Sequence, residues 1–235
     1  MRSQKYNNLE WANHEQYLKA FVHAGKFKKS DTVLDVGTGT GIIAHAIAPF
    51  VREVIGFDIS QDMLEHSNWR GNMYFIRRDV RNLIFANDVF DKLTCRLVFH
   101  HILRNRQRAM DECYRVLKKG GLMIFSEGVP PTKRVRKDYT EIFRIKEKRH
   151  IFYEEDLVKL MRNSGFKEIK TVILTLKKMS VRNWLESSGI PQINQQKIYN
   201  LHKNAGDYFK EDYNVIETRD DCLINMKMAI ITGKK

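Results

Sequence analysis

Three glycines at alternate positions constrain this chain more than any other feature. The stretch from Val33 to Gly41 reads VLDVGTGTG, an apolar run that leads into the glycines, and a helical pattern follows it. Because glycine has no Cβ, such a loop can turn tightly and let a ligand approach backbone N–H groups. A dinucleotide fingerprint would place its third glycine at position 42, which is Ile42. The loop therefore predicts a ligand site, with a spacing other than the dinucleotide one.

A carboxylate ends the next predicted strand, which runs from Val54 to Asp58. In an open α/β sheet, an acid at the end of the second strand faces a ribose and can accept hydrogen bonds from its hydroxyls. The alternatives are a purely structural turn for the glycines and a helix N-cap for Asp58. The strand, the loop, the following helix and the acid at this distance together favour the ligand site.

Short apolar runs alternate with amphipathic stretches from residue 31 to residue 130, as in βαβ units around a parallel sheet. The strands are predicted at 32–36, 54–58, 73–77, within 90–99, and at 122–126, 169–176 and 226–232. The helices are predicted at 42–50, 62–69, 107–118, 154–165, 181–188 and 193–205. The pattern predicts a doubly wound α/β fold.

The composition of the chain limits the classes of protein to which it can belong. The 41 lysines and arginines against 28 acids give a formal charge of +13, which would attract anions such as nucleic acid or an acidic metabolite, or reflect a basic source proteome. No apolar run approaches the roughly 18 residues of a membrane span, and the first residues lack a secretory pattern, so we expect a cytoplasmic protein. The three cysteines show no metal-ligand spacing, so no metal site is predicted.

Further motifs extend the pattern beyond the glycine loop and Asp58. They are Asp79, Phe90-Asp91, the stretch RVLKKGG from Arg115 to Gly121, and the tract from Phe152-Tyr153 to Gly165-Phe166. With these, the chain resembles the class I S-adenosylmethionine-dependent methyltransferases over about residues 30 to 175. It is most similar to the type 11 group, which includes ubiquinone and menaquinone biosynthesis methyltransferases. The resemblance implies a Rossmann-like, mostly parallel sheet of seven strands with an antiparallel last strand.

The resemblance also implies a role for each part of the cofactor site. The methionine part of S-adenosylmethionine would lie on the glycine loop, through Gly37, Thr38, Gly39 and Gly41. Asp35 would lie near the amino group, directly or through water. Arg96 and Leu97, at the end of the fourth strand, would face the sulfonium.

The nucleoside half of the cofactor would lie along the next strand ends. Asp58 would bind the ribose hydroxyls, and Ile59 and Met63 would lie beside the adenine. Asp79 would accept from the adenine amino group, with Val80 packed on the ring. A lining of acids and main-chain groups suits a ligand that carries an amine, a ribose and a cationic sulfur.

Methyl transfer mainly requires that a nucleophile be placed against the methyl group while water is excluded. A general base is needed only where the acceptor must lose a proton. His100 and His101 follow the fourth strand, and imidazole is the side chain best suited to act as a base near neutral pH. His101 matches a histidine often seen there in the group, so it is the first candidate and His100 the second. Helix capping or packing is the alternative for both.

Four parts are expected along the chain. They are an N-terminal helical cap (1–30), the S-adenosylmethionine-binding core (31–176), a helical insertion that covers the acceptor side (177–215) and the final strand (216–235). The insertion follows from length, because strands six and seven of this fold pair as a hairpin, yet about fifty residues separate Leu176 from Met226. Ser180 is placed to cap its first helix.

Three functions compete at this point. The first is methylation of a small or carrier-tethered metabolite, which can be anionic, on an N, O or C atom. The second is an RNA methyltransferase, supported by the net charge, although the fourth strand lacks the Asn/Asp-Pro-Pro-aromatic motif of many nucleobase enzymes. The third is a non-catalytic protein that binds the cofactor. Eight basic residues between Lys133 and Arg149 fit an anion-binding surface or a solvated helix with apolar side chains turned inward. A homodimer stays open.

Overall fold

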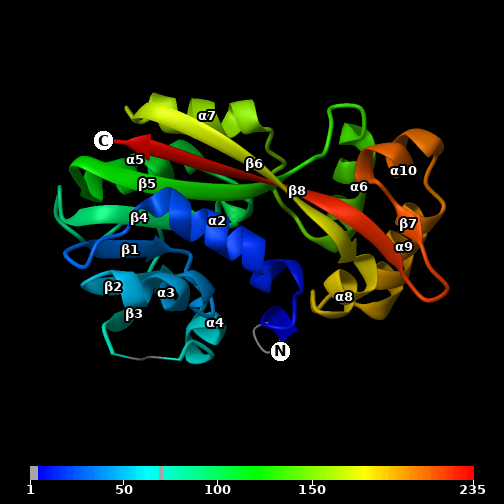
Figure 1. Cartoon of the computed structure of the whole chain (residues 1–235), viewed down its shortest axis with the longest axis horizontal. Coiled ribbons are helices and arrows are strands. Elements are labelled where there is room, and N and C mark those ends of the chain that lie inside the picture. Colours follow the sequence, from blue (N-terminus) through cyan, green and yellow to red (C-terminus); the bar gives the residue numbers. More distant parts are fainter. Residues whose placement is uncertain (1–4, 69–70) are drawn as a thin grey trace.

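The computed structural model describes residues 5–68 and 71–235 (Figure 1). The helices are α2 (Glu15–Gly25), α3 (Ile42–Ile47), α4 (Gln61–Glu65), α5 (Arg106–Val116), α6 (Arg136–Lys146), α7 (Glu154–Asn163), α8 (Val181–Glu186), α9 (Gln192–Lys203) and α10 (Asp207–Tyr213). Short 3-10 turns lie at Trp11–Asn13, Ala48–Phe50 and Phe99–His101. The strands are β1 (Thr32–Val36), β2 (Glu53–Asp58), β3 (Met73–Arg77), β4 (Phe90–Arg96), β5 (Leu117–Val129), β6 (Lys167–Ser180), β7 (Ile216–Glu217) and β8 (Cys222–Lys234).

One mixed sheet organises the core, in the order β3-β2-β1-β4-β5-β8-β6, with the two-residue β7 paired to β8. Strands β1 to β5 pair in parallel, whereas β8 is antiparallel to both β5 and β6. The order reverses between β1 and β4, which are neighbours. Ligands of open α/β sheets bind at such a reversal, outside the carboxyl ends of the strands. The predicted fold class is confirmed, including the antiparallel last strand.

Helices cover both faces of this sheet. On one face, α5 and α7 bury Met110, Cys113 and Met161 against strand residues such as Leu34 and Leu93. On the other face, α2 and α3 pack against the alternate strand positions, which include Val33 and Val54. Side chains on both sides of β1 are buried, as a central parallel strand requires. Within the described residues, no helix is both long and apolar enough to cross a membrane.

Several element boundaries differ from the sequence prediction. The predicted helix 42–50 ends at Ile47 and continues as a 3-10 turn containing Pro49. The predicted helix 62–69 is the shorter α4, and Trp69 lies outside the described residues. The predicted helix 107–118 ends at Val116, because Leu117 already pairs with β4.

The largest correction concerns the predicted strands 169–176 and 226–232. They are the central parts of β6 and β8, which are 14 and 13 residues long. Their pairing continues past the core as far as Ser180 and Leu223, so residues 177–180 are strand and not part of a helical insertion. Figure 1 shows both strands running out of the core sheet toward α6 and α8–α10.

The segment between β6 and β8 folds into helices that share a third apolar cluster with α6. We call α6, α8, α9 and α10 the cap. The cluster contains Tyr139 and Phe143 from α6, Trp184 from α8, Ile198 from α9 and Phe209 from α10. The helices predicted at 181–188 and 193–205 are present as α8 and α9, and α10 was not predicted. Ser180 caps α8 as expected, since its hydroxyl accepts from the Asn183 amide at 2.8 Å.

Candidate functional site

A cavity of about 650 Å³ opens at the carboxyl ends of β1, β2 and β4, where the strand order reverses. Every residue predicted for cofactor binding lines it except Gly41: Asp35, Gly37, Thr38, Gly39, Asp58, Ile59, Met63, Asp79, Val80, Arg96 and Leu97. His101 lines it as well, and His100 does not. Gly41 instead starts α3 as its N-cap, with a φ of 84°.

The glycine loop forms a backbone cradle against this cavity. Gly37 and Gly39 have φ values of 65° and 57°, in the left-handed region that favours glycine. A Cβ on Gly37 would lie 2.1 Å from Val98 Cγ2, so the loop packs there without room for a side chain. A Cβ on Gly39 would meet only the Met63 methyl, at 3.1 Å. The cradle is therefore open on the Gly39 side, which suits close approach of a ligand such as S-adenosylmethionine.

Asp58 joins the glycine loop to the end of β2. Its Oδ2 accepts from the Gly39 amide at 2.9 Å, and its Oδ1 accepts from the Ser60 amide at 2.8 Å. Burial raises the pKa of Asp58, against the opposing effect of these backbone N–H groups. The N-cap of α4 is Ser60, whose hydroxyl accepts from the Met63 amide. Asp58 is thus not the helix cap considered from sequence, and it lies against the loop at the cavity wall.

Asp35 lies beneath the loop, 2% exposed. Its two carboxylate oxygens accept from the hydroxyls of Thr38 and Thr94, each at 2.7 Å. Burial raises the pKa of Asp35 to about 6. The carboxyl therefore supports the loop through Thr38 and presents a charge to the cavity floor that depends on pH.

Two arginines modify the predicted lining. Arg81 binds the carboxylate of Asp79 through Nε at 3.0 and 3.1 Å, and this bond holds the pKa of Asp79 below its ordinary value. Arg96 donates to the backbone oxygen of Ala12 at 2.8 Å and lies over the Tyr17 ring. Arg96 thereby ties the N-terminal segment to the end of β4. Neither partnership was foreseen from the sequence.

The chain turns sharply after β4. Leu97 has a φ of 62°, which is uncommon for a residue other than glycine and occurs where the surroundings impose it. The 3-10 turn that follows brings His101 to the edge of the cavity and buries His100 behind it. His100 is buried, and its Nδ1 lies 2.6 Å from Oε2 of Glu127 on β5. Glu127 is fully buried, which raises its pKa to about 7.

A second, smaller pocket of about 100 Å³ adjoins the cavity beneath the cap. Tyr6, Leu97 and His101 line both spaces, so they mark the boundary between them. The smaller pocket is also lined by residues from segments that are far apart in the sequence: Trp11, His100, Tyr139, Phe143, Lys146, Glu147, Arg149, Trp184 and Met228. A large cavity and a small one that meet at a histidine suit a reaction between two bound molecules.

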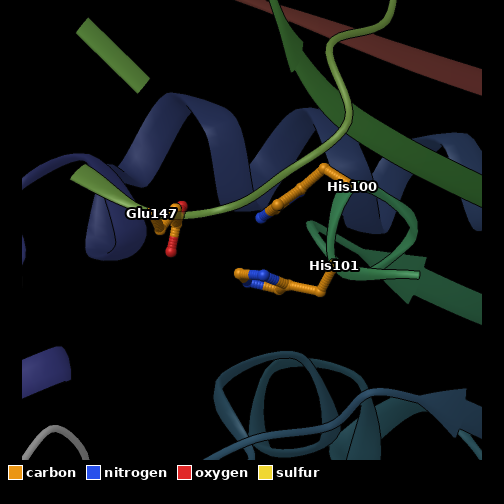
Figure 2. A group of neighbouring side chains, drawn as sticks. All are labelled: His100, His101 and Glu147. Atoms are coloured by element: carbon orange, nitrogen blue, oxygen red, sulfur yellow. The ribbon is translucent and has the colours of Figure 1, made fainter. Parts of the chain in front are cut away.

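His100, His101 and Glu147 point toward one another at this boundary (Figure 2), and their candidate ligand atoms all lie within 4.8 Å. Sequence spacing could not reveal this group, because Glu147 is 46 residues from His101. Lys146 Nζ lies 3.0 Å and Arg149 Nη1 lies 3.5 Å from Glu147 Oε1. Although burial opposes it, Lys146 and His101 hold the pKa of Glu147 far below its ordinary value. The two cations disfavour a divalent metal ion and favour an anion or a proton relay.

Four of the eight basic residues between Lys133 and Arg149 form ion pairs within the protein. Lys133 pairs with Glu155, Arg134 with Glu211 and Asp212, and Lys146 and Arg149 with Glu147. The apolar side chains of α6 are buried, as the solvated-helix reading expected. These ion pairs reduce the support that the segment lent to an RNA-binding surface.

Comparisons with known proteins relate this chain to methyltransferases. A family model described as a methyltransferase domain matches residues 34–125. YcgJ of Bacillus subtilis, an uncharacterized methyltransferase, is 25% identical over 93% of this chain and 90% of its own length. A demethylmenaquinone methyltransferase of Thermotoga maritima is 39% identical, but the match covers 44% of this chain and 47% of that protein.

Further comparisons support the same relationship. A protein of Encephalitozoon cuniculi provisionally named a methyltransferase is 31% identical, and this chain covers 72% of it. The crystal structure of YcgJ superposes with a TM-score of 0.83, 22% identity and coverage of 94% and 99% of the two chains. Asp35, Gly37, Gly39 and Asp58 line the cavity at the carboxyl ends of the strands, where open α/β sheets bind their ligands. The chain therefore belongs to the class I S-adenosylmethionine-dependent methyltransferases, and it is an enzyme whose methyl donor is S-adenosylmethionine.

Proposed function

We propose that this methyltransferase modifies a small-molecule acceptor bound in the pocket beneath the cap, with His101 as the general base. One observation carries the proposal: His101 lines both the cofactor cavity and the smaller pocket. S-adenosylmethionine, when bound, supplies an electrophilic methyl group. An acceptor in the smaller pocket would lie on the other side of the boundary that His101 marks.

The residues of the cavity divide the binding of the cofactor between them. Gly37 and Gly39 would offer backbone N–H groups to its methionine part, with Asp35 beneath them. Asp58 is already oriented by the Gly39 and Ser60 amides, and it would accept from the ribose hydroxyls. Asp79 would have to exchange its Arg81 partner for the adenine amino group, because both of its oxygens bind Arg81.

The residues around His101 suit proton transfer. A base that takes a proton from the acceptor becomes a cation, and the ionised Glu147 beside it would stabilise that cation. His100, fixed through Nδ1 to Glu127, packs against the His101 ring with centroids 4.0 Å apart. We therefore assign His101 as the base and His100 as a positioning residue. The cap would close the pocket through Trp184, which excludes water from the reaction.

The acceptor class can be tested with a radiolabelled methyl donor. We expect label to enter the low-molecular-weight fraction of a cell extract and not total RNA. Transfer to small molecules should depend weakly on salt, whereas an RNA substrate would lose affinity steeply through counterion release. Label in RNA, with a steep salt dependence, would overturn the small-molecule proposal in favour of the RNA alternative.

The role of His101 is tested on the acceptor so identified. His101→Ala should lower the transfer rate by about 10²–10⁴-fold, while binding of S-adenosylhomocysteine stays within a few-fold of wild type. His101→Gln, which keeps a polar side chain, should be as slow. The matched control is His23→Ala, an exposed histidine on α2 outside both cavities. An unchanged rate and pH profile in His101→Ala would show that the reaction needs no base there.

A further inference from the structure

Two residues that line the smaller pocket each carry a buried N–H donor with no hydrogen-bond acceptor among the described residues. The two donors are Trp11 Nε1 and Arg149 Nε. An unpaired buried donor costs roughly 1–3 kcal/mol, so nearly all such groups in folded proteins have a partner. Two such donors on residues that line one small pocket favour a ligand that supplies hydrogen-bond acceptors.

Charge indicates the kind of acceptor. The side chains of Lys146 and Arg149 are only 7% and 9% exposed. Among the described residues that line the pocket, Glu147 is the only acid, and it faces both cations. The nearby Glu127 is partly protonated at neutral pH, because burial raises its pKa to about 7. The lining thus places two buried cations beside one acid, which favours an anionic ligand.

The geometry of Arg149 agrees with this reading. Its guanidinium lies over the Phe143 ring, 4.2 Å from the centroid. A guanidinium in such a cation–π contact keeps its N–H groups in its own plane, where they can bind carboxylate or phosphate oxygens. The body of the ligand would then lie among Tyr139, Phe143 and Trp184, in a volume of about 100 Å³.

We infer that the methyl acceptor carries an anionic group, a carboxylate or a phosphate, which Arg149 binds together with Lys146 and Trp11 Nε1 while the reactive atom faces His101. The inference rests on the proposed function in one respect, that the pocket beneath the cap is the acceptor site. It adds the substrate class: a small anionic molecule.

The test measures binding and does not require the natural acceptor. The probes are benzoate, its neutral analogue benzamide, and inorganic phosphate, each titrated calorimetrically into the full chain saturated with S-adenosylhomocysteine. The variants are Arg149→Met, which keeps the apolar stem, and Arg149→Lys, which keeps the charge but loses Nε. The control is Arg144→Gln, an exposed arginine near the end of α6, the helix that precedes Arg149 in the chain. Binding of S-adenosylhomocysteine reports whether each variant is folded.

We expect wild type and Arg144→Gln to bind benzoate or phosphate at least about tenfold more tightly than benzamide, since a charge-assisted bond contributes about 1.5–3 kcal/mol. Preference for benzoate supports a carboxylic acid acceptor, and preference for phosphate supports a phosphorylated one. Arg149→Met should lose the preference, and Arg149→Lys should keep part of it. Equal binding of acid and amide by wild type, or an undiminished preference in folded Arg149→Met, overturns the inference. His101→Ala should retain the preference, so a failure of the base assignment is distinguishable from a failure here.

Discussion

The two cavities of this enzyme are built in different ways. The larger one is lined by short stretches at the carboxyl ends of successive strands, such as residues 35–39 at the end of β1 and residues 58–63 at the end of β2. The smaller one draws its lining from Tyr6 at one end of the chain to Met228 near the other. A site made of contiguous stretches can be recognised from its sequence pattern. A site assembled by tertiary packing has no such pattern, and its chemistry emerges only from the fold.

The largest expected effect is a loss of cofactor binding when Gly39 is replaced. Gly39→Val would place a β-branched residue at a φ of 57° and press against the Met63 methyl. Such strain costs on the order of 1–3 kcal/mol, and the side chain would also block the approach to the loop. We expect binding of S-adenosylhomocysteine to weaken by about 100-fold or more in calorimetry. Near-normal binding would show that the loop is not the cradle.

Asp58→Ala should have the next largest effect, again on the cofactor side alone. It removes the ribose acceptor and the partner of the Gly39 amide. Loss of a bond to a charged group should weaken cofactor binding by about 1.5–3 kcal/mol. Asp58→Asn, which keeps one oxygen, should bind the cofactor with an affinity between those of wild type and Asp58→Ala. If the dissociation constant of Asp58→Ala is unchanged, the ribose is held elsewhere.

Trp184→Ala tests whether the two sites are separable. The indole is 7% exposed and lines only the smaller pocket. We expect the transfer rate to fall by roughly tenfold as the acceptor loses its orientation, with cofactor binding unchanged. Ile193→Ala on α9, 64% exposed, is the control. Weakened cofactor binding in a folded Trp184→Ala protein would contradict the separation of the cavities.

The last prediction concerns the pH dependence of stability, to which Glu127 contributes at the boundary between the two cavities. The folded pKa of Glu127, about 7, exceeds the ordinary value of 4.5, so its contribution to stability is present below about pH 4.5 and is lost as the pH rises through 7. Glu127→Gln should reduce this loss by about 2 kcal/mol or less. Urea unfolding at about pH 5 and pH 8 measures it, with the exposed Glu141→Gln as control. A residual slope should remain, because the pKa of Asp35 is raised in the same direction.

The difference between the two cavities also explains which features of the protein could be predicted from its sequence. The doubly wound α/β class, the ligand loop after β1 and the Ser180 cap could be predicted from local periodicity, glycine spacing and residues next to an element end. The ends of β6 and β8 were missed because exposed strand residues such as Lys177 and Lys178 carry no apolar alternation. Glu127 and Glu147 were missed because an acid acquires a role only when folding buries it beside a particular histidine. The place of His101 after β4 suggested a role for it, but the sequence did not show which side chains from other segments would surround it.

The extended pairing of β6 and β8 has a mechanical consequence. The two strands stay hydrogen-bonded from Lys167–Lys234 in the core to Ser180–Leu223 under the cap, with register shifts at two places along the way. Because the pairing resumes after each shift, a large movement of the cap would break hydrogen bonds between strands that also complete the core sheet. Amide hydrogens along both strands should therefore exchange slowly and together. The cap, which we propose to cover the acceptor, and the core are therefore joined by one strand pair, and the two should unfold as one cooperative unit.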